Sequence, residues 1–283
     1  MLFWLRPPFL IITDPSINML YGAERTRFKQ IELSIKFFRR IIPVLVSDSA
    51  APEIIASTVE SFHADPGAVL FPELYLEAAQ RYNVRKPGIP VIVLGSRRLT
   101  YENMPDPTEG FYYIRPDTEA DLYEAGINIA FLAENYAASA ENAHNSNILV
   151  IYDIFMDNNF RTALERGLGS TGFSGTIDYI EAQNEHILWE NYSYVVLIGS
   201  ASHFLEQNTV IPIILFSWLE PTLTPFNVKV IFNDSPWVLA GNTLEVMADN
   251  GSFFSSEIIV LHSRIHENSG FLLRLLRQYI NFI

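Results

Sequence analysis

The chain has 283 residues, of which 49% are hydrophobic and 18% are charged, so it can bury a sizeable core and is not intrinsically disordered. Its 32 acidic against 19 basic residues give a net charge of −13, which makes a nucleic acid an unsuitable partner because phosphates would be repelled. It contains no cysteine, which excludes disulfides, thiolate metal sites and cysteine nucleophiles and leaves the redox compartment open.

Apolar runs with strand character alternate with amphipathic helical stretches in the first part of the chain. One helix, over 24–40, carries Phe28, Ile31, Ile35 and Phe38 on one face. Apolar runs separated by helices indicate a parallel sheet that is covered on both faces. The predicted strands are 9–13, 42–47, 68–71, 90–94 and 111–115, and the other predicted helices begin at Pro52 and span 74–82.

The alternation of strand-like and helical segments is interrupted over 99–110 and resumes after Pro116, which predicts two βαβαβ blocks joined near that residue. The later strands are predicted at 148–152, 176–181, 193–199, 212–217, 228–233 and 258–262. The later helices are predicted at 118–136, 158–168, 201–206, 238–249 and 271–282. The last of these is apolar nearly all round, which favours a core or dimer contact over the alternative, membrane attachment. We expect one lobe over 9–115 plus 236–255 and a second over 116–235 plus 256–283, with hinges near 114–116, 233–236 and 254–257.

The segment 117–175 resembles the second lobe of the type I periplasmic binding proteins and of LacI-type effector domains. In that family an Asp, here Asp117, follows the crossing strand and begins a helix rich in small residues, and a further strand follows, here at 147–152. Arg161 stands where the family's arginine would, although Leu164 replaces the expected Gly. The small residues of the helix are Ala120, Ala125, Gly126, Ala130 and Ala133.

The resemblance covers roughly residues 9–262 through the order and spacing of elements, and it implies an α/β fold with two Rossmann-like lobes, whose parallel sheets are joined by a three-strand hinge. It implies a non-enzymatic solute-binding protein of an ABC-type uptake system, with an ABC permease as partner and no cofactor. Such a protein closes on its ligand by hinge motion. Two alternatives stay open: an α/β enzyme, such as a nucleotide-using transferase, and a ligand-sensing regulatory domain without a DNA-binding module. The chain is expected to be a monomer or a dimer.

Two local patterns have a simpler interpretation than a functional one. The run 167–172 matches G-x-G-x-x-G, but a helix precedes it and a strand follows, the reverse of a dinucleotide site, so we interpret it as a helix C-cap and turn. His262 and His266 have the spacing of a metal pair on a helix, but no third ligand is near except Glu267, so no metal site is predicted. The chain has no nucleophile elbow or phosphate loop.

Polar and aromatic residues follow many predicted strands, and ligands of open α/β sheets bind outside the carboxyl ends of the strands. Directly after the first strand, Asp14-Pro15-Ser16 either offers a carboxylate and N–H groups to a ligand or caps and turns the chain. Carboxylates, hydroxyls, an Arg and aromatic plates together suit a small polar ligand that is sugar- or nucleoside-like. The predicted ligand-binding residues are Asp14, Ser16, Ser96, Phe155, Asp157, Arg161, Ser200, Ser217, Trp218, Asp234 and Trp237.

The apolar segments of the chain indicate only in part the cellular location of the protein. No apolar run reaches the 18 or so residues that span a bilayer. The start of the chain is interrupted by Arg6 and two prolines and lacks the features of a signal peptide. We therefore expect a mature periplasmic or cell-envelope protein whose leader is not present in this chain, with a cytoplasmic protein as the alternative.

Overall fold

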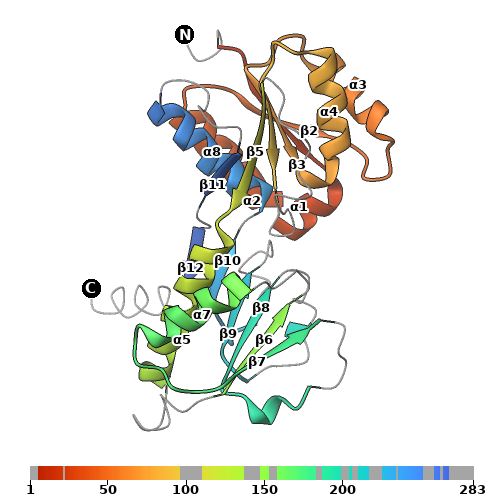
Figure 1. Cartoon of the computed structure of the whole chain (residues 1–283). Coiled ribbons are helices and arrows are strands. Elements are labelled where there is room, and N and C mark those ends of the chain that lie inside the picture. The colour runs from red at the N-terminus through yellow and green to blue at the C-terminus, as the bar shows by residue number, and fades with distance from the viewer. Residues whose placement is uncertain are drawn as a thin grey trace, which may run out of the picture. The chain divides into compact units, whose positions relative to one another are not determined.

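The computed structural model of the chain describes residues 6–21, 23–95, 110–136, 147–152, 158–182, 187–198, 204–205, 210–216, 225–233, 235–250, 258–261 and 264–267 (Figure 1). The chain divides into two compact units. Unit 1 comprises Met1–Pro116 and Asp234–Leu261, and unit 2 comprises Asp117–Asn233 and His262–Ile283. The chain therefore passes from one unit to the other three times. Within the described residues, no helix combines the length and the apolar character needed to cross a membrane.

Unit 1 is built on a six-stranded sheet in the order β11-β5-β4-β3-β1-β2, in which every pair of neighbours is parallel. Helices α2 and α8 lie on one face of this sheet, and α3 and α4 lie on the other (Figure 1). The strands are β1 (Phe9–Thr13), β2 (Ile41–Leu45), β3 (Ala68–Pro72), β4 (Val91–Leu94), β5 (Phe111–Pro116) and β11 (Ile258–Leu261). The helices are α1 (Pro15–Tyr21), α2 (Ala23–Lys36), α3 (Pro52–Phe62), the short 3₁₀ helix η2 (Glu73–Tyr75), α4 (Leu76–Arg85) and α8 (Pro236–Asn250).

Unit 2 repeats this strand order, β12-β10-β9-β8-β6-β7, with β12 as the one antiparallel edge strand among those described. Helices α5 and α7 pack on one face, and the segments around Trp189 and Phe204 pack on the other. The strands are β6 (Ile148–Tyr152), β7 (Ile177–Glu181), β8 (Tyr194–Ile198), β9 (Ile213–Phe216), β10 (Val228–Asn233) and β12 (Arg264–Glu267). The helices are α5 (Thr118–Tyr136), α7 (Asn158–Gly169) and the 3₁₀ turn η4 (Trp189–Asn191).

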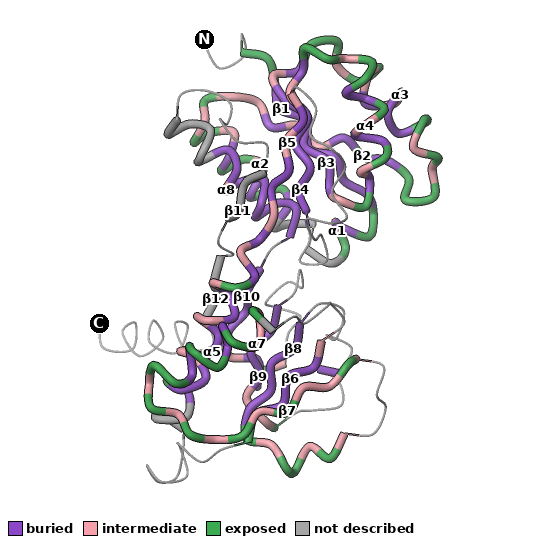
Figure 2. The backbone as a smooth tube through the Cα atoms, in the orientation of Figure 1, coloured by how far each residue is buried: buried purple, intermediate pink, exposed green. Residues whose placement is uncertain are grey.

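The central strands of both sheets are buried along their whole length (Figure 2). This is the pattern of a parallel sheet covered on both faces, as the continuous apolar runs of the sequence predicted. The predicted fold class, an α/β chain with two parallel sheets, is therefore confirmed.

Three elements differ from the sequence-based expectation. Helix α1 occupies 15–21, where only a turn was expected. Strand β11 pairs with β5 in unit 1, although 256–283 was assigned to the second lobe, and the third crossing follows Leu261 instead of lying near 254–257. Strand β12 was not expected, and it places His266 on a strand, not on a helix. Periodicity reports which segments are extended but not which sheet they join, so the error lies in the pairing of β11. The predicted helix over 271–282 lies outside the described residues.

The glycine-rich run after α7 is a helix C-cap, as the sequence indicated. The N–H of Phe173 donates to the carbonyl oxygen of Leu168 at 3.3 Å, and the N–H of Gly172 donates to that of Gly169 at 3.1 Å. These two bonds form a Schellman motif, whose C′ residue adopts the left-handed conformation. Gly172 holds that position with a φ of 79°, which costs glycine little.

Helices α5 and α7 approach each other closely through two glycines. A Cβ atom on Gly126 would lie 2.5 Å from the carbonyl oxygen of Leu164, and one on Gly167 would overlap the carbonyl oxygen of Tyr123. Leu164 is itself fully buried in the core beside these helices. Within α7, the glycine that meets α5 closely is Gly167, three residues after Leu164.

We predict that Gly167→Ala lowers the free energy of unfolding by about 3 kcal/mol, because backbone atoms of α5 would have to move to admit the methyl group. Gly169→Ala is the matched control, since a Cβ there meets no atom within 4 Å, and it should be neutral or slightly stabilising. Urea unfolding followed by circular dichroism measures both variants. Equal effects of the two substitutions would contradict the close helix crossing.

Candidate functional site

The strand order of unit 1 reverses between β1 and β3. From β1 the chain first adds β2 on one side and then returns to add β3 on the other. In open α/β sheets the ligand binds at such a point, outside the carboxyl ends of the strands. Asp14 is the first residue after β1, and Tyr75 lies in the 3₁₀ turn after β3, so both residues lie at this point.

Asp14 joins the ends of these two strands by hydrogen bonds. Its side chain is fully buried, and its Oδ2 atom accepts a hydrogen bond from the Tyr75 hydroxyl at 2.6 Å. Its Oδ1 atom accepts from the Ser16 hydroxyl at 2.5 Å and from the N–H of Ile17 at 2.9 Å. The bond from Ile17 makes Asp14 the N-cap of α1, with Pro15 at the first helical position.

The ionisation of both partners follows from these contacts. Burial alone would raise the pKa of Asp14, but the hydrogen bonds from Ser16, Tyr75 and the Ile17 N–H outweigh it and hold the pKa below its ordinary value of 3.8. Burial, the hydrogen bond to Asp14 and the negative charge of Asp14 raise the pKa of the Tyr75 hydroxyl. At neutral pH the pair is therefore a carboxylate and a protonated phenol, and neither group is available as a general base or acid.

Exposed polar side chains surround this buried pair. Ser16 is exposed, and Ser47 and Ser49, which follow β2, are exposed and lie 3.0 Å apart through their Oγ atoms. Asp48 between them is exposed and close enough for its charge to act on Tyr75. The edge thus presents hydroxyl donors and acceptors and one carboxylate on a rigid base, which suits the recognition of a hydroxylated ligand. Among the described residues, no group of His, Cys, Asp and Glu could hold a metal ion.

Unit 2 has the same reversal, between β6 and β8. Six predicted ligand residues follow the strands at the corresponding edge, and a seventh follows β4 in unit 1. All seven lie outside the described residues, so their contacts stay predictions. They are Ser96, Phe155, Asp157, Ser200, Ser217, Trp218 and Asp234.

Arg161 lies on α7 in unit 2 and packs against the edge strand β7. Its guanidinium carbon lies 4.7 Å from the centre of the Tyr179 ring, which is a cation–π contact. Burial raises the pKa of Tyr179, and Glu165 adds to that rise while Arg161 opposes it. Arg161 is half-buried, and its Nε atom has no acceptor among the described residues, so the side chain retains a donor for another partner.

Trp237 lies at the start of α8 in unit 1 and is fully buried. Its indole N–H has no acceptor within the described part of the chain. In this structure the ring packs in the core and presents no exposed face for stacking.

Tyr75 is a candidate site residue that was not predicted from the sequence, because the apolar periodicity placed it inside a helix over 74–82. Its position three residues after Pro72, which ends β3, was the available signal, because ligands bind outside the carboxyl ends of such strands.

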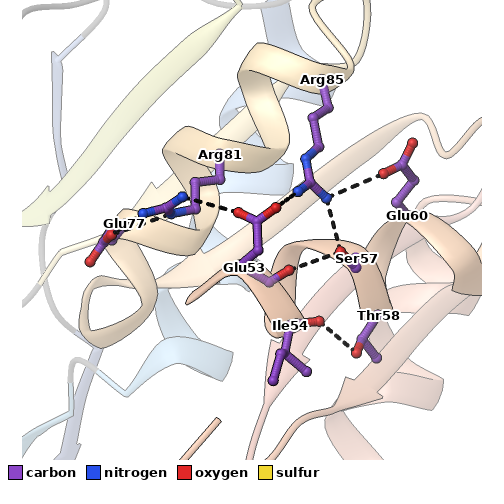
Figure 3. Close-up of polar contacts among 8 residues, drawn as sticks. All are labelled: Glu53, Ile54, Ser57, Thr58, Glu60, Glu77, Arg81 and Arg85. Atoms are coloured by element: carbon purple, nitrogen blue, oxygen red, sulfur yellow. Dashed lines mark hydrogen bonds and ion pairs between the residues drawn. The ribbon is translucent and has the colours of Figure 1, made fainter. Parts of the chain in front are cut away.

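A cluster of charged side chains lies on α3 and α4 of unit 1 (Figure 3). Arg81 bridges Glu53 at 3.0 Å and Glu77 at 2.7 Å, and Arg85 pairs with Glu53 and donates to the Ser57 hydroxyl at 2.9 Å. These side chains are partly to largely exposed and are satisfied by one another. The cluster therefore joins two helices with modest energy and is not a candidate ligand site.

Comparisons with known proteins agree with the geometry of the two units. No protein-family model and no curated protein matches the chain. Solved structures do match. AraP, an arabinose binding protein from Geobacillus stearothermophilus, is similar with a TM-score of 0.58 and 11% identity, covering 92% of this chain and 96% of that one.

Two further structures extend the comparison. An ABC transporter periplasmic solute binding protein from Actinobacillus succinogenes 130z, with bound D-allose, has a TM-score of 0.54 and 11% identity, and the match covers 93% of this chain and 98% of that one. A LacI transcriptional regulator from a Rhodococcus species has a TM-score of 0.55 and 12% identity over 92% and 96% of the two chains. The chain therefore has the fold of the type I periplasmic binding proteins and LacI effector domains, as the resemblance predicted. Identities this low show the fold alone.

We predict that Asp14→Ala lowers the free energy of unfolding by about 2–4 kcal/mol, because it removes an N-cap and leaves the buried Tyr75 hydroxyl without its acceptor. Asp14→Asn is the matched variant. It keeps the Oδ1 acceptor for Ile17 and should cost less. Denaturant unfolding measures both, and equal costs would contradict a capping role.

The pH dependence of stability provides a control for the Asp14 variants. Because the pKa of Asp14 is lowered in the folded protein, the ionised side chain stabilises the fold above the ordinary pKa of 3.8, and this contribution is lost as the pH falls below 3.8 through the native value. The stability difference between the wild type and Asp14→Asn should shrink accordingly below about pH 4. A difference that stays constant to about pH 3 would show that the charge of Asp14 does not contribute.

Proposed function

We propose that the chain is the solute-binding protein of an ABC-type uptake system and captures a small polar ligand, sugar- or nucleoside-like, between its two lobes. One observation carries this proposal: both units have the same strand order, and in both the order reverses next to the first strand. A chain with two such edges can present two complementary half-sites to one ligand, and hinge closure is the usual way to bring half-sites together.

The chemistry of the half-sites supports a hydroxylated ligand. The described edge of unit 1 carries Ser16, Ser47, Asp48 and Ser49 around a rigid buried base. In the sequence, the segments that follow the strands of unit 2 contain Phe155, Asp157, Ser200, Ser217 and Trp218. Carboxylates and hydroxyls bind sugar hydroxyls, and aromatic rings stack on the apolar faces of sugars and bases. Two of the similar structures are an arabinose binding protein and a solute binding protein with bound D-allose, and both sugars belong to this class.

The proposed role is binding without chemical conversion. The one buried carboxylate of the described edge, Asp14, is committed to three hydrogen bonds and has a lowered pKa. A general base needs a lone pair directed at the substrate and a pKa nearer to neutrality. An α/β enzyme at the same edge would have to use other residues.

A second function is favoured by one comparison, the similarity to a LacI transcriptional regulator. On that hypothesis the chain is a ligand-sensing regulatory domain, and it acts in the cytoplasm instead of the periplasm or cell envelope. Permease and ATPase genes beside the gene for this chain would favour uptake, and their absence together with an adjacent DNA-binding module would favour sensing.

We predict that one member of a panel of monosaccharides and nucleosides binds with saturable heat in calorimetry and raises the melting temperature by mass action. The same ligand should lower the radius of gyration in small-angle scattering, because closure brings the lobes together. Tight binding without a change in scattering would count against closure. Recovery of an altered ligand by mass spectrometry would count against a non-enzymatic role.

We predict that Arg161→Ala weakens ligand binding by about 1.5–3 kcal/mol, the range for a lost charge-assisted hydrogen bond. Arg161→Lys keeps the positive charge but not the planar guanidinium, so the ligand affinity of this variant should fall between that of the wild type and that of Arg161→Ala. Loss of the contact with Tyr179 costs the fold only about 0.5–1 kcal/mol, so the variant stays folded for calorimetry. Unchanged affinity in Arg161→Ala would remove this residue from the site.

A further inference from the structure

Helix α2 presents an apolar stripe to solvent. Its spacing predicts one apolar face, and such a face normally packs on the core. In the structure the four side chains are instead exposed over much of their surface: Phe28 by 72%, Ile31 by 47%, Ile35 by 64% and Phe38, just beyond the helix end, by 68%. We refer to these four residues as the α2 stripe.

The opposite face of α2 is the one that packs inside unit 1. Leu33 is fully buried, and the stem of Lys29 is buried with its Nζ atom 2.9 Å from the carboxylate of Glu32. A Cβ atom on Gly241 of α8 would lie 3.2 Å from Lys29 and 3.4 Å from Leu33, so these two residues fill the space between α2 and α8. The orientation of α2 is thus held by a contact with α8, and the stripe faces outward as a consequence.

The backbone at Phe38 carries strain that the other described helix with the same ending avoids. The N–H of Arg39 donates to the carbonyl oxygen of Ser34 at 3.2 Å, and that of Phe38 donates to Ile35 at 3.3 Å, which is the Schellman motif seen after α7. The C′ position is Gly172 after α7 and Phe38 after α2, and Phe38 has a φ of 47°. A bulky residue in this conformation is an outlier that a protein retains where the side chain has a use.

The spacing of the α2 stripe is symmetric. The intervals between its members are three, four and three residues, with Phe at both ends and Ile at both inner positions. A two-fold axis beside residue 33 would therefore place Phe28 opposite Phe38 of a second copy, and Ile31 opposite its Ile35. This is the self-complementarity that an isologous contact between identical chains requires, and the a/d spacing suits an antiparallel helix pair.

We propose that two copies of this chain associate through the α2 stripe, with the two α2 helices antiparallel about residue 33. The exposed area of the four side chains is roughly 500 Å², within the range of patches that mark interaction sites. It would form the apolar centre of an interface of about 800 Å² per partner. The contact lies on a face of the sheet, away from the carboxyl edge, so it can coexist with ligand binding and does not depend on it.

Sedimentation equilibrium tests the association. We expect the wild type to dimerise with protein concentration, and Ile35→Glu to raise the dissociation constant about 100-fold or more, because a charge would be buried at the centre of the contact. Val84→Glu on α4 is the matched control, since Val84 is also exposed, by 81%, and it should leave the dimer unchanged. A wild-type monomer at all concentrations, as expected if the apolar C-terminal segment of the same chain covers the stripe, would overturn the proposal. So would a dimer that Ile35→Glu does not weaken.

Disulfide trapping tests the register, and the absence of native cysteine makes it unambiguous. Positions 28 and 38 are about 15 Å apart along a helix, and a disulfide needs Cα atoms within about 7 Å. A mixture of Phe28→Cys and Phe38→Cys should therefore cross-link between the two variants, and neither should cross-link to itself. Cross-linking of each variant to itself would indicate a parallel pair and overturn the arrangement.

The variant Phe38→Gly distinguishes the effect of Phe38 on dimerisation from its effect on the stability of the monomer. Glycine relieves the left-handed strain, so the dilute monomer should melt about 2–4 °C higher. The same change should raise the dissociation constant of the dimer at least about tenfold, because an aromatic contact is lost. A variant that is more stable and dimerises as well as the wild type would overturn the role of Phe38.

Discussion

A parallel strand can pair with the next one only after the chain has crossed back over a face of the sheet. In this molecule that requirement places helices on both faces of unit 1 and buries the central strands from end to end. It also aligns the carboxyl ends of the parallel strands along one edge of each unit, and in unit 1 the described polar residues after β1 and β2 lie at this edge. The position of the candidate site is therefore a result of strand order, not of any local motif.

Asp14 shows how the same residue supports the fold and the site. Its carboxylate caps α1 and accepts the Tyr75 hydroxyl, so it links the end of β1 to the turn after β3 across the strand reversal. That arrangement uses the lone pairs that a ligand would otherwise meet. We propose the exposed hydroxyls of Ser16, Ser47 and Ser49 as the groups that remain for recognition beside the buried Asp14.

The sequence predicts segments well and their partners poorly. The bounds of β1, α5, β6 and β10 agree with the prediction, since long apolar runs and sustained periodicity leave little choice. Helix α1 was predictable from Asp14-Pro15, an N-cap followed by the favoured first residue, but a short helix has too few apolar positions to show a period. The pairing of β11 with β5 depends on contacts more than a hundred residues apart in sequence, which a local pattern does not contain. Of the candidate ligand residues, the sequence could identify the strand ends, but it could not show that Trp237 is core or that Tyr75 joins Asp14.

Helix α2 marks a different limit of sequence analysis. A hydrophobic period identifies which residues share a face, but it does not determine whether that face meets the core of its own chain or another surface. The deciding contacts here are those of Lys29 and Leu33 with α8, an element some 200 residues further along the chain. The stem of Lys29 can replace an apolar side chain in this packing because its charge reaches Glu32 at the surface. With the buried face satisfied in this way, the intramolecular fold leaves Phe28, Ile31 and Ile35 exposed. The left-handed Phe38 is the fourth member of the same surface, and the proposed contact with a second copy gives a role to its strained backbone.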